Sequence, residues 1–157
     1  MKKREQLAPV YLQRVKDCLF RIIGYAESKG VKIGLESRRG YEEIPTEREL
    51  TVLLAEIECA HTGYWHDFGH SQIKNNLGFV DHLEWLQTAG SRAFGCHVQD
   101  CIWPARDHEP PFSGDIEFEK LIPLLPTNCL FVWEMSPNKT ADAIRQSIRI
   151  WKERFGE

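Results

Sequence analysis

The sequence predicts an α/β fold in which a leading helix is followed by four β/α units with parallel strands. Amphipathic helical segments alternate with short apolar segments along the 157 residues. The apolar segments end at Glu36, Asp67, His97 and Glu134, which are 31, 30 and 37 residues apart. These spacings leave room for a helix between successive strands, which is the arrangement of a parallel sheet built from right-handed crossovers.

The first half of the chain contains two predicted helices and two predicted strands. A helix is expected over residues 9–29, with Pro9 in its first turn and Gly30 at its end. Its apolar stripe consists of Leu12, Val15, Leu19, Ile22, Ile23 and Ala26. A strand follows over residues 31–36. Thr46 and Glu49 form a capping-box pattern that opens a helix to about Glu58, and residues 63–67 form the next strand.

The second half continues the alternation. A loop is expected to residue 76, then a helix over residues 79–87 that stops at Gly90 and turns His82 toward solvent. A strand over residues 92–98 precedes a long loop, residues 99–116. A short helix over 118–125, a strand over 129–134 and a helix over 140–155 complete the pattern.

Composition excludes several classes of protein. A net charge of -3 with 42% hydrophobic residues fits one globular domain over residues 1–157 and argues against a nucleic-acid binder, which usually has a basic face. No apolar run approaches the roughly 20 residues of a membrane helix, so no membrane contact is expected. The five cysteines form no CxxC pair, and no signal peptide is visible. We therefore expect a reducing, cytoplasmic compartment.

The residues that end the four strands form a candidate cation site. The carboxyl ends of parallel strands meet at one edge of the sheet, so Glu36, Asp67, His97 and Glu134 are expected to converge there. Two Glu, one Asp and one His give an oxygen-rich donor set suited to Mn²⁺, Mg²⁺, Co²⁺ or Zn²⁺. Any one of these residues alone is equally well explained as a loop or helix-cap residue. All four at strand ends favour a metal site.

Five motifs in order carry a resemblance to a known family. They are IGLE (33–36), HDFGH (66–70), GCHVQD (95–100), H-x-P-P-x-x-G-x-I-x-F (108–118) and VWEMSP (132–137). This series resembles xylose isomerase-like TIM barrels, a superfamily of sugar and sugar-phosphate isomerases and epimerases that also includes endonuclease IV-type enzymes. A complete (βα)8 barrel needs about 250 residues. The chain is therefore similar to a partial barrel, the C-terminal half with about four βα units.

The resemblance assigns roles to individual residues. Glu36, Asp67, His97 and Glu134 match the family's metal ligands, and the two glutamates also match its catalytic acid/base pair. His70, His108 and Glu42 match positions that contact substrate, and His108 binds a further metal in the endonuclease branch. Independently of the resemblance, Trp103 and Arg106 of the long loop are candidates for stacking on a sugar and for holding a phosphate or hydroxyl, with a surface role as the alternative.

The activity implied is a divalent-metal-dependent sugar or sugar-phosphate isomerase or epimerase, in which metal-bound glutamates move a proton next to a carbonyl. One alternative is a non-catalytic fragment or partner subunit of a split barrel, since four strands leave two open edges that a second copy or another chain would cover. A further alternative is an endonuclease IV-like phosphodiesterase. That branch has an Asp-Arg-His run, and the order here, Arg106-Asp107-His108, does not match it.

Two residues near the motifs have open roles. Phe112 stands where the family usually has Gly, and its ring is expected either to narrow the mouth of the site or to alter contacts with a phosphate or sugar. Asp100 either orients His97 or caps the loop that follows.

Overall fold

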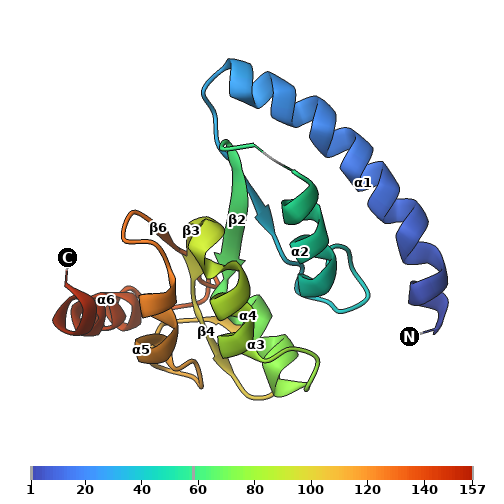
Figure 1. Cartoon of the computed structure of the whole chain (residues 1–157). Coiled ribbons are helices and arrows are strands. Elements are labelled where there is room, and N and C mark those ends of the chain that lie inside the picture. Colours follow the sequence, from blue (N-terminus) through green and yellow to red (C-terminus); the bar gives the residue numbers. More distant parts are fainter. Residues whose placement is uncertain (1, 58, 157) are drawn as a thin grey trace.

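The computed structural model describes residues 2–57 and 59–156 and confirms the predicted parallel sheet. Its strands are β1 (Ile33–Glu36), β2 (Thr62–Asp67), β3 (Ala93–Val98) and β6 (Leu130–Trp133), and they lie in the order β1-β2-β3-β6. Every adjacent pair is parallel. The sheet at the centre of Figure 1 is therefore one half of the closed ring of strands that a TIM barrel has.

The predicted long loop contains structure of its own. Within it, β4 (Asp100–Ile102) and β5 (Arg106–Glu109) pair as an antiparallel hairpin. The hairpin follows β3 directly, so it rises from the carboxyl end of the sheet. It places His108 and the loop after it beside the strand ends.

Helices fill the connections between strands. They are α1 (Lys2–Ser28), α2 (Glu47–Glu56), α3 (Phe68–Asn76), α4 (His82–Ala89), α5 (Phe118–Leu121) and α6 (Ala141–Phe155), with short 3₁₀ turns at Gly90–Arg92 and Ile122–Leu124. The capping box of Thr46 and Glu49 is present, whereas the predicted end of this helix at about Glu58 lies outside the described residues. Helix α3 was predicted as loop; it is short and polar, and Asp67 caps it directly after β2.

Helix α1 is longer than predicted and runs along the outside of the molecule, next to α2 (Figure 1). Pro9 lies inside this helix rather than in its first turn, so that prediction was wrong. The predicted end at Gly30 is confirmed. Gly30 has a φ of 66°, and the N–H groups of Gly30 and Val31 donate to the carbonyls of Glu27 and Ala26. This is the Schellman pattern, which needs a residue that tolerates the left-handed conformation.

The core lies between the sheet and the helices on one of its faces. Tyr64, Phe68, Leu86 and Phe118 are completely or almost completely buried there. His82 is buried too, which corrects the expectation that it faces solvent. Its Nε2 lies 3.1 Å from His66 Nε2, and its Nδ1 lies 3.0 Å from Gln72 Oε1.

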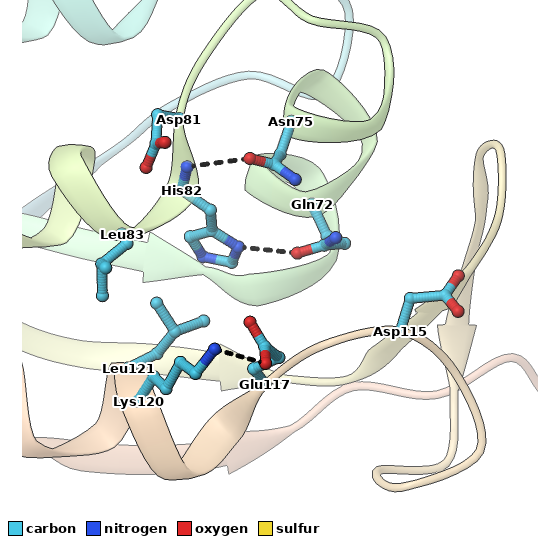
Figure 2. A pocket seen from close by; sticks show the side chains of 9 residues that line it. All are labelled: Gln72, Asn75, Asp81, His82, Leu83, Asp115, Glu117, Lys120 and Leu121. Carbon is cyan, nitrogen blue, oxygen red and sulfur yellow. Dashed lines mark hydrogen bonds and ion pairs between the residues drawn. The ribbon is translucent and has the colours of Figure 1, made fainter.

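The buried histidines stay neutral. Burial lowers the pKa of His82 to about 3 and that of His66 well below its usual value. Figure 2 shows His82 and Gln72 beside a cavity of about 230 Å³ between α4 and the segment that begins α5. These groups form a polar seam within the core, separate from the strand ends.

No helix among the described residues covers the opposite face of the sheet. Trp65 lies on this open face, and its indole fills the space above Gly34 and Gly95, where an added Cβ would lie 3.0 Å or less from Trp65 atoms. On the outer strand β6, Leu130 and Val132 are 63% and 44% exposed. In the described part of the chain, no helix is long and apolar enough to cross a membrane.

Candidate metal centre

The four predicted ligands meet at the carboxyl edge of the sheet. Parallel register pairs Asp67 with His97, and Glu36 lies at the end of the neighbouring strand β1. Glu134 follows β6, and its N–H donates to the carbonyl of Val98. The Nδ1 atom of His97 lies 3.5 Å from Glu36 Oε1, 3.3 Å from Asp67 Oδ2 and 3.1 Å from Glu134 Oε2. The structure therefore brings together the four residues that the sequence singled out.

His70 joins this group from the first turn of α3. Its Nδ1 lies 3.3 Å from Glu36 Oε1 and 3.7 Å from Asp67 Oδ2. Two overlapping sets of potential ligands result, Glu36–Asp67–His70 and Asp67–His97–Glu134, each with donor atoms within 4.8 Å of one another. Asp67 belongs to both sets and is the centre of the arrangement.

Burial grades across the cluster. The Asp67 side chain is fully buried, whereas that of Glu134 is 43% exposed. The carboxylate of Asp67, 3.3 Å away and assisted by those of Glu134 and Glu36, raises the pKa of His97 despite partial burial. Burial opposes protonation of His70, but the carboxylates of Glu36 and Asp67 outweigh it and raise the pKa of His70. The centre thus has a strongly negative potential that favours a cation.

The residues present fit a divalent ion. Within the described part of the chain, the Nδ1 atoms of both His70 and His97 are buried and have no hydrogen-bond partner, although carboxylate oxygens lie near them. Buried polar atoms normally have partners. A cation between the nitrogens and the carboxylate oxygens would satisfy all of them at once, and the mixed oxygen–nitrogen donor set suits Mn²⁺, Co²⁺ or Zn²⁺.

Gln99 positions Asp67, and sequence reasoning missed it. The Gln99 amide donates to Asp67 Oδ1 and Oδ2 at 3.0 and 2.9 Å, and the backbone N–H of His70 donates to Oδ1 at 2.8 Å. The Gln99 oxygen in turn accepts from the backbone N–H of His108. Gln99 is fully buried. Its place two residues after His97, inside the GCHVQD motif, was the available signal.

Asp100 caps the following loop instead of orienting His97. Its carboxylate accepts from the backbone N–H groups of Cys101, Gly114 and Ile116 at 2.7, 2.8 and 3.2 Å. Gly114 is required there, because an added Cβ would lie 2.5 Å from the Asp100 oxygen. Of the two roles open for Asp100, the structure shows the loop cap.

Phe112 does not narrow the mouth of the site, so that expectation was wrong. Its φ of 69° is left-handed, which explains why Gly suits this position. The ring packs away from the strand ends, with centroids 5.5 Å from Phe118, 6.1 Å from Trp151 and 6.3 Å from Phe155. Phe112 therefore anchors the loop to α6.

The predicted substrate-contacting residues lie at different depths. His108 Nε2 is 3.7 Å from Glu134 Oε1, so it borders the centre. Trp103 and Arg106, on the β4–β5 hairpin, are largely exposed, and the Arg106 guanidinium pairs with Glu109 at 3.3 Å. Glu42 is exposed in the loop before α2 and lines a hollow with Leu7 and Tyr11 of α1.

A family model described as xylose isomerase-like TIM barrel matches residues 2–154. A search of curated proteins gave no match. Solved structures of the same fold include a D-tagatose 3-epimerase-like protein, with a TM-score of 0.73 and 24% identity over 91% of this chain and 54% of the other.

Two further structures agree. The 3-keto-D-glucoside 4-epimerase of E. coli gives a TM-score of 0.69 and 17% identity over 90% of this chain and 53% of its own. The IolI protein, solved with a zinc atom bound, gives 0.73 and 18% over 93% and 58%. The chain thus spans about half the length of the structures it matches.

Proposed function

Because the chain belongs to the xylose isomerase-like TIM barrel family, we propose that it supplies the metal-binding half of a sugar or sugar-phosphate epimerase or isomerase. The convergence of Glu36, Asp67, His97 and Glu134 carries this proposal. Epimerases among the structures of the same fold support the class of substrate. The zinc atom in IolI supports a divalent ion.

The four residues would hold the ion, with His70 beside them. When bound, a divalent ion polarises a sugar carbonyl and the hydroxyl next to it and so acidifies the C–H bond between them. A carboxylate within hydrogen-bond reach of that carbon then acts as general base. Asp67 is suited to holding the cation rather than moving a proton, because it is fully buried and fixed by Gln99 and His70.

Glu36 and Glu134 are the proposed proton carriers. They come from the two outer strands of the sheet, β1 and β6, and both are partly exposed to the open side. Carboxylates that approach one carbon from two sides remove a proton from one face and return it to the other, which inverts the carbon. Epimerisation therefore fits this placement better than isomerisation, for which one carboxylate suffices.

The remaining predicted residues form the proposed substrate wall. His108 borders Glu134 and is placed to donate to a sugar oxygen. Trp103 offers a largely exposed indole for stacking, and Arg106 a cation for a hydroxyl or phosphate. Glu42 lies in the loop between β1 and α2, and it can contact substrate only if that loop faces the sugar.

Calorimetric titration with Mn²⁺ and exchange of a ketose C–H in D₂O test the proposal together. Asp67→Asn is expected to abolish stoichiometric Mn²⁺ binding. Glu134→Gln is expected to weaken binding, and to suppress epimer formation at saturating Mn²⁺ more than it suppresses exchange, because Glu36 remains as a base. Wild-type Mn²⁺ affinity in Asp67→Asn would refute the assignment of the metal centre.

A second candidate function is a partner subunit that acts only when the barrel is completed. The uncovered face of the sheet, with exposed Leu130 and Val132, favours this candidate. Apolar strand edges of this kind promote association. We propose that a second copy or a separate chain covers this face. Mass measurement in solution, with and without Mn²⁺, tests it: a monomer that binds Mn²⁺ but does not catalyse C–H exchange indicates a separate chain.

A further inference from the structure

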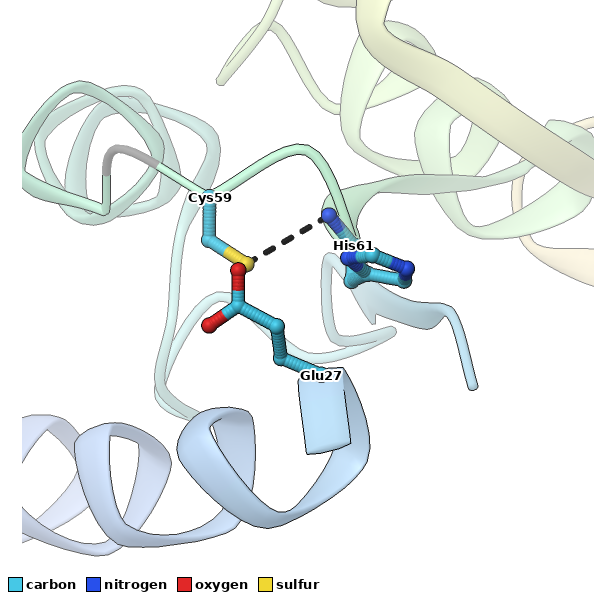
Figure 3. Close-up of side chains that lie close together, drawn as sticks. All are labelled: Glu27, Cys59 and His61. Atoms are coloured by element: carbon cyan, nitrogen blue, oxygen red, sulfur yellow. Dashed lines mark hydrogen bonds between the residues drawn. The ribbon is translucent and has the colours of Figure 1, made fainter. Parts of the chain in front are cut away.

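A second group of metal-ligand side chains lies away from the strand-end centre. Glu27, Cys59 and His61 place a carboxylate oxygen, a sulfur and an imidazole nitrogen within 4.8 Å of one another. Glu27 lies in the last turn of α1, and the other two flank Ala60 in the segment before β2, as Figure 3 shows. This segment enters the amino end of β2, whereas Asp67 ends the same strand. The two groups therefore lie at opposite ends of the sheet.

We infer that Glu27, Cys59 and His61 form a second, zinc-type cation site that joins helix α1 to the sheet. A thiolate, an imidazole and a carboxylate are the three donor types that Zn²⁺ takes in proteins. The thiolate distinguishes this site from the strand-end centre, whose donors are oxygen and nitrogen. Both Glu27 and the Cys59–His61 segment are accessible enough for water to complete a tetrahedral set.

The histidine supplies independent support. His61 Nδ1 is buried and has no hydrogen-bond partner in the described part of the chain. A buried ring nitrogen without a partner is uncommon because its desolvation is uncompensated. Coordination of a cation by His61 would supply the missing interaction.

The sulfur of Cys59 already accepts a hydrogen bond from the backbone. The backbone N–H of His61 donates to Cys59 Sγ at 3.4 Å, as the dashed line in Figure 3 shows. Hydrogen bonds of this type stabilise a metal-bound thiolate and orient it. Cys59 is a free cysteine, so its sulfur is available for coordination.

The backbone on both sides is already fixed. The Glu27 carbonyl accepts from Gly30 in the helix end, and the Cys59 carbonyl accepts from the N–H of Thr62 at 3.0 Å. The His61 carbonyl accepts from Ile33 of β1 at 2.7 Å. In a tetrahedral zinc site the ligand atoms are about 3.5 Å apart. The three ligand atoms lie within 4.8 Å of one another, and Glu27, which is exposed, has the rotational freedom to bring its carboxylate closer.

Cobalt(II) substitution tests the site without any activity assay, because a cobalt–thiolate bond gives an intense charge-transfer absorption that oxygen and nitrogen ligands do not give. Titration of the full chain to saturation is expected to produce this band with the intensity of one thiolate-bound cobalt per chain, while cobalt at the strand-end centre adds nothing to it. Cys59→Ser should abolish it. Cys18→Ser, which changes an exposed free cysteine in helix α1, should leave the band intact. Asp67→Asn should also leave it intact, which separates this site from the strand-end centre.

Two outcomes would overturn the inference: absence of the band in the wild-type chain, or a band that survives Cys59→Ser. Glu27→Gln guards against a folding defect, because Glu27 is exposed on a helix surface. Glu27→Gln is expected to weaken the Co²⁺ binding that the thiolate band reports by tenfold or more, while the circular dichroism spectrum stays unchanged. Unaltered affinity in Glu27→Gln would remove the link to α1 and refute the site as assigned.

Discussion

Replacement of Gln99 by Leu tests whether the carboxylate at the centre of the metal site must be held in place. Leu has a similar volume, so Gln99→Leu removes polar contacts without opening a large cavity. Asp67 loses the donor that bridges both of its oxygens and keeps the backbone N–H of His70. The backbone N–H of His108 loses its acceptor.

Two effects follow, and their sizes differ. A hydrogen bond to a charged group contributes roughly 1.5–3 kcal/mol and an unpaired buried donor costs about 1–3 kcal/mol, whereas the buried Leu returns part of this, so a net loss of about 2–3 kcal/mol is expected. Loss of a partner that orients a metal ligand typically lowers metal affinity about 10–100-fold. Gln99→Leu should therefore lower both stability and Mn²⁺ affinity.

Urea unfolding and calorimetric Mn²⁺ titration measure the two effects separately. Gln72→Leu is the matched control, because Gln72 is also a buried glutamine, bonded to His82 and Asn76 in the polar seam. It should lower stability and leave Mn²⁺ affinity unchanged. Equal Mn²⁺ affinities for wild type and Gln99→Leu, both folded, would refute the role given to Gln99.

Three further predictions concern the rest of the fold. Phe112→Gly relieves a left-handed φ worth about 1–2 kcal/mol but loses a half-buried ring contact worth about 2–3 kcal/mol, so thermal unfolding should show a small net loss and Mn²⁺ affinity should not change. Although burial favours its neutral form, Arg4 and the Thr46 N–H lower the pKa of Glu49, so its contribution is present above roughly pH 4.3 and is lost as the pH falls below that value. Glu49→Gln should therefore flatten the acid limb of the stability profile. Leu130→Lys should weaken any association through β6, measured by sedimentation, whereas the same change at exposed Val52 of α2 should not.

The parallel sheet and the convergence of the proposed ligands were predictable because both follow from short sequence patterns and from the order of the strands. An apolar run that ends in an acidic residue specifies a strand and its carboxyl end together, and parallel order then brings Glu36, Asp67 and Glu134 to one edge. No knowledge of side-chain packing is needed for that inference. This is why spacing alone located a cluster that the structure brings within hydrogen-bonding range of His97.

The errors arise where tertiary contacts decide. His82 is a polar residue of a type often found at the surface. Its burial is possible because His66 and Gln72 supply hydrogen-bond partners for both of its ring nitrogens. Phe112 replaces the Gly that its left-handed backbone conformation favours, and a bulky residue at this position was expected to narrow the mouth of the site. The direction of its ring is instead set by contacts with Phe118 of α5 and Trp151 of α6. Helix α3 escaped detection because nine polar-rich residues give a weak periodic signal.

The proposed metal ligands and the surface that would enclose a sugar differ in how completely this chain supplies them. Each proposed ligand of the strand-end centre lies near the end of, or directly after, one of four strands that are neighbours in the sheet, and Gln99, which holds Asp67, follows β3. We therefore expect the proposed cation site to form within this chain. The surface that would enclose a sugar is incomplete, because no described helix covers the face of the sheet that bears Trp65 and Val132. Under the proposed function, metal affinity and catalysis should therefore separate: Mn²⁺ binding is expected of the chain alone, and turnover is expected only when that face is covered.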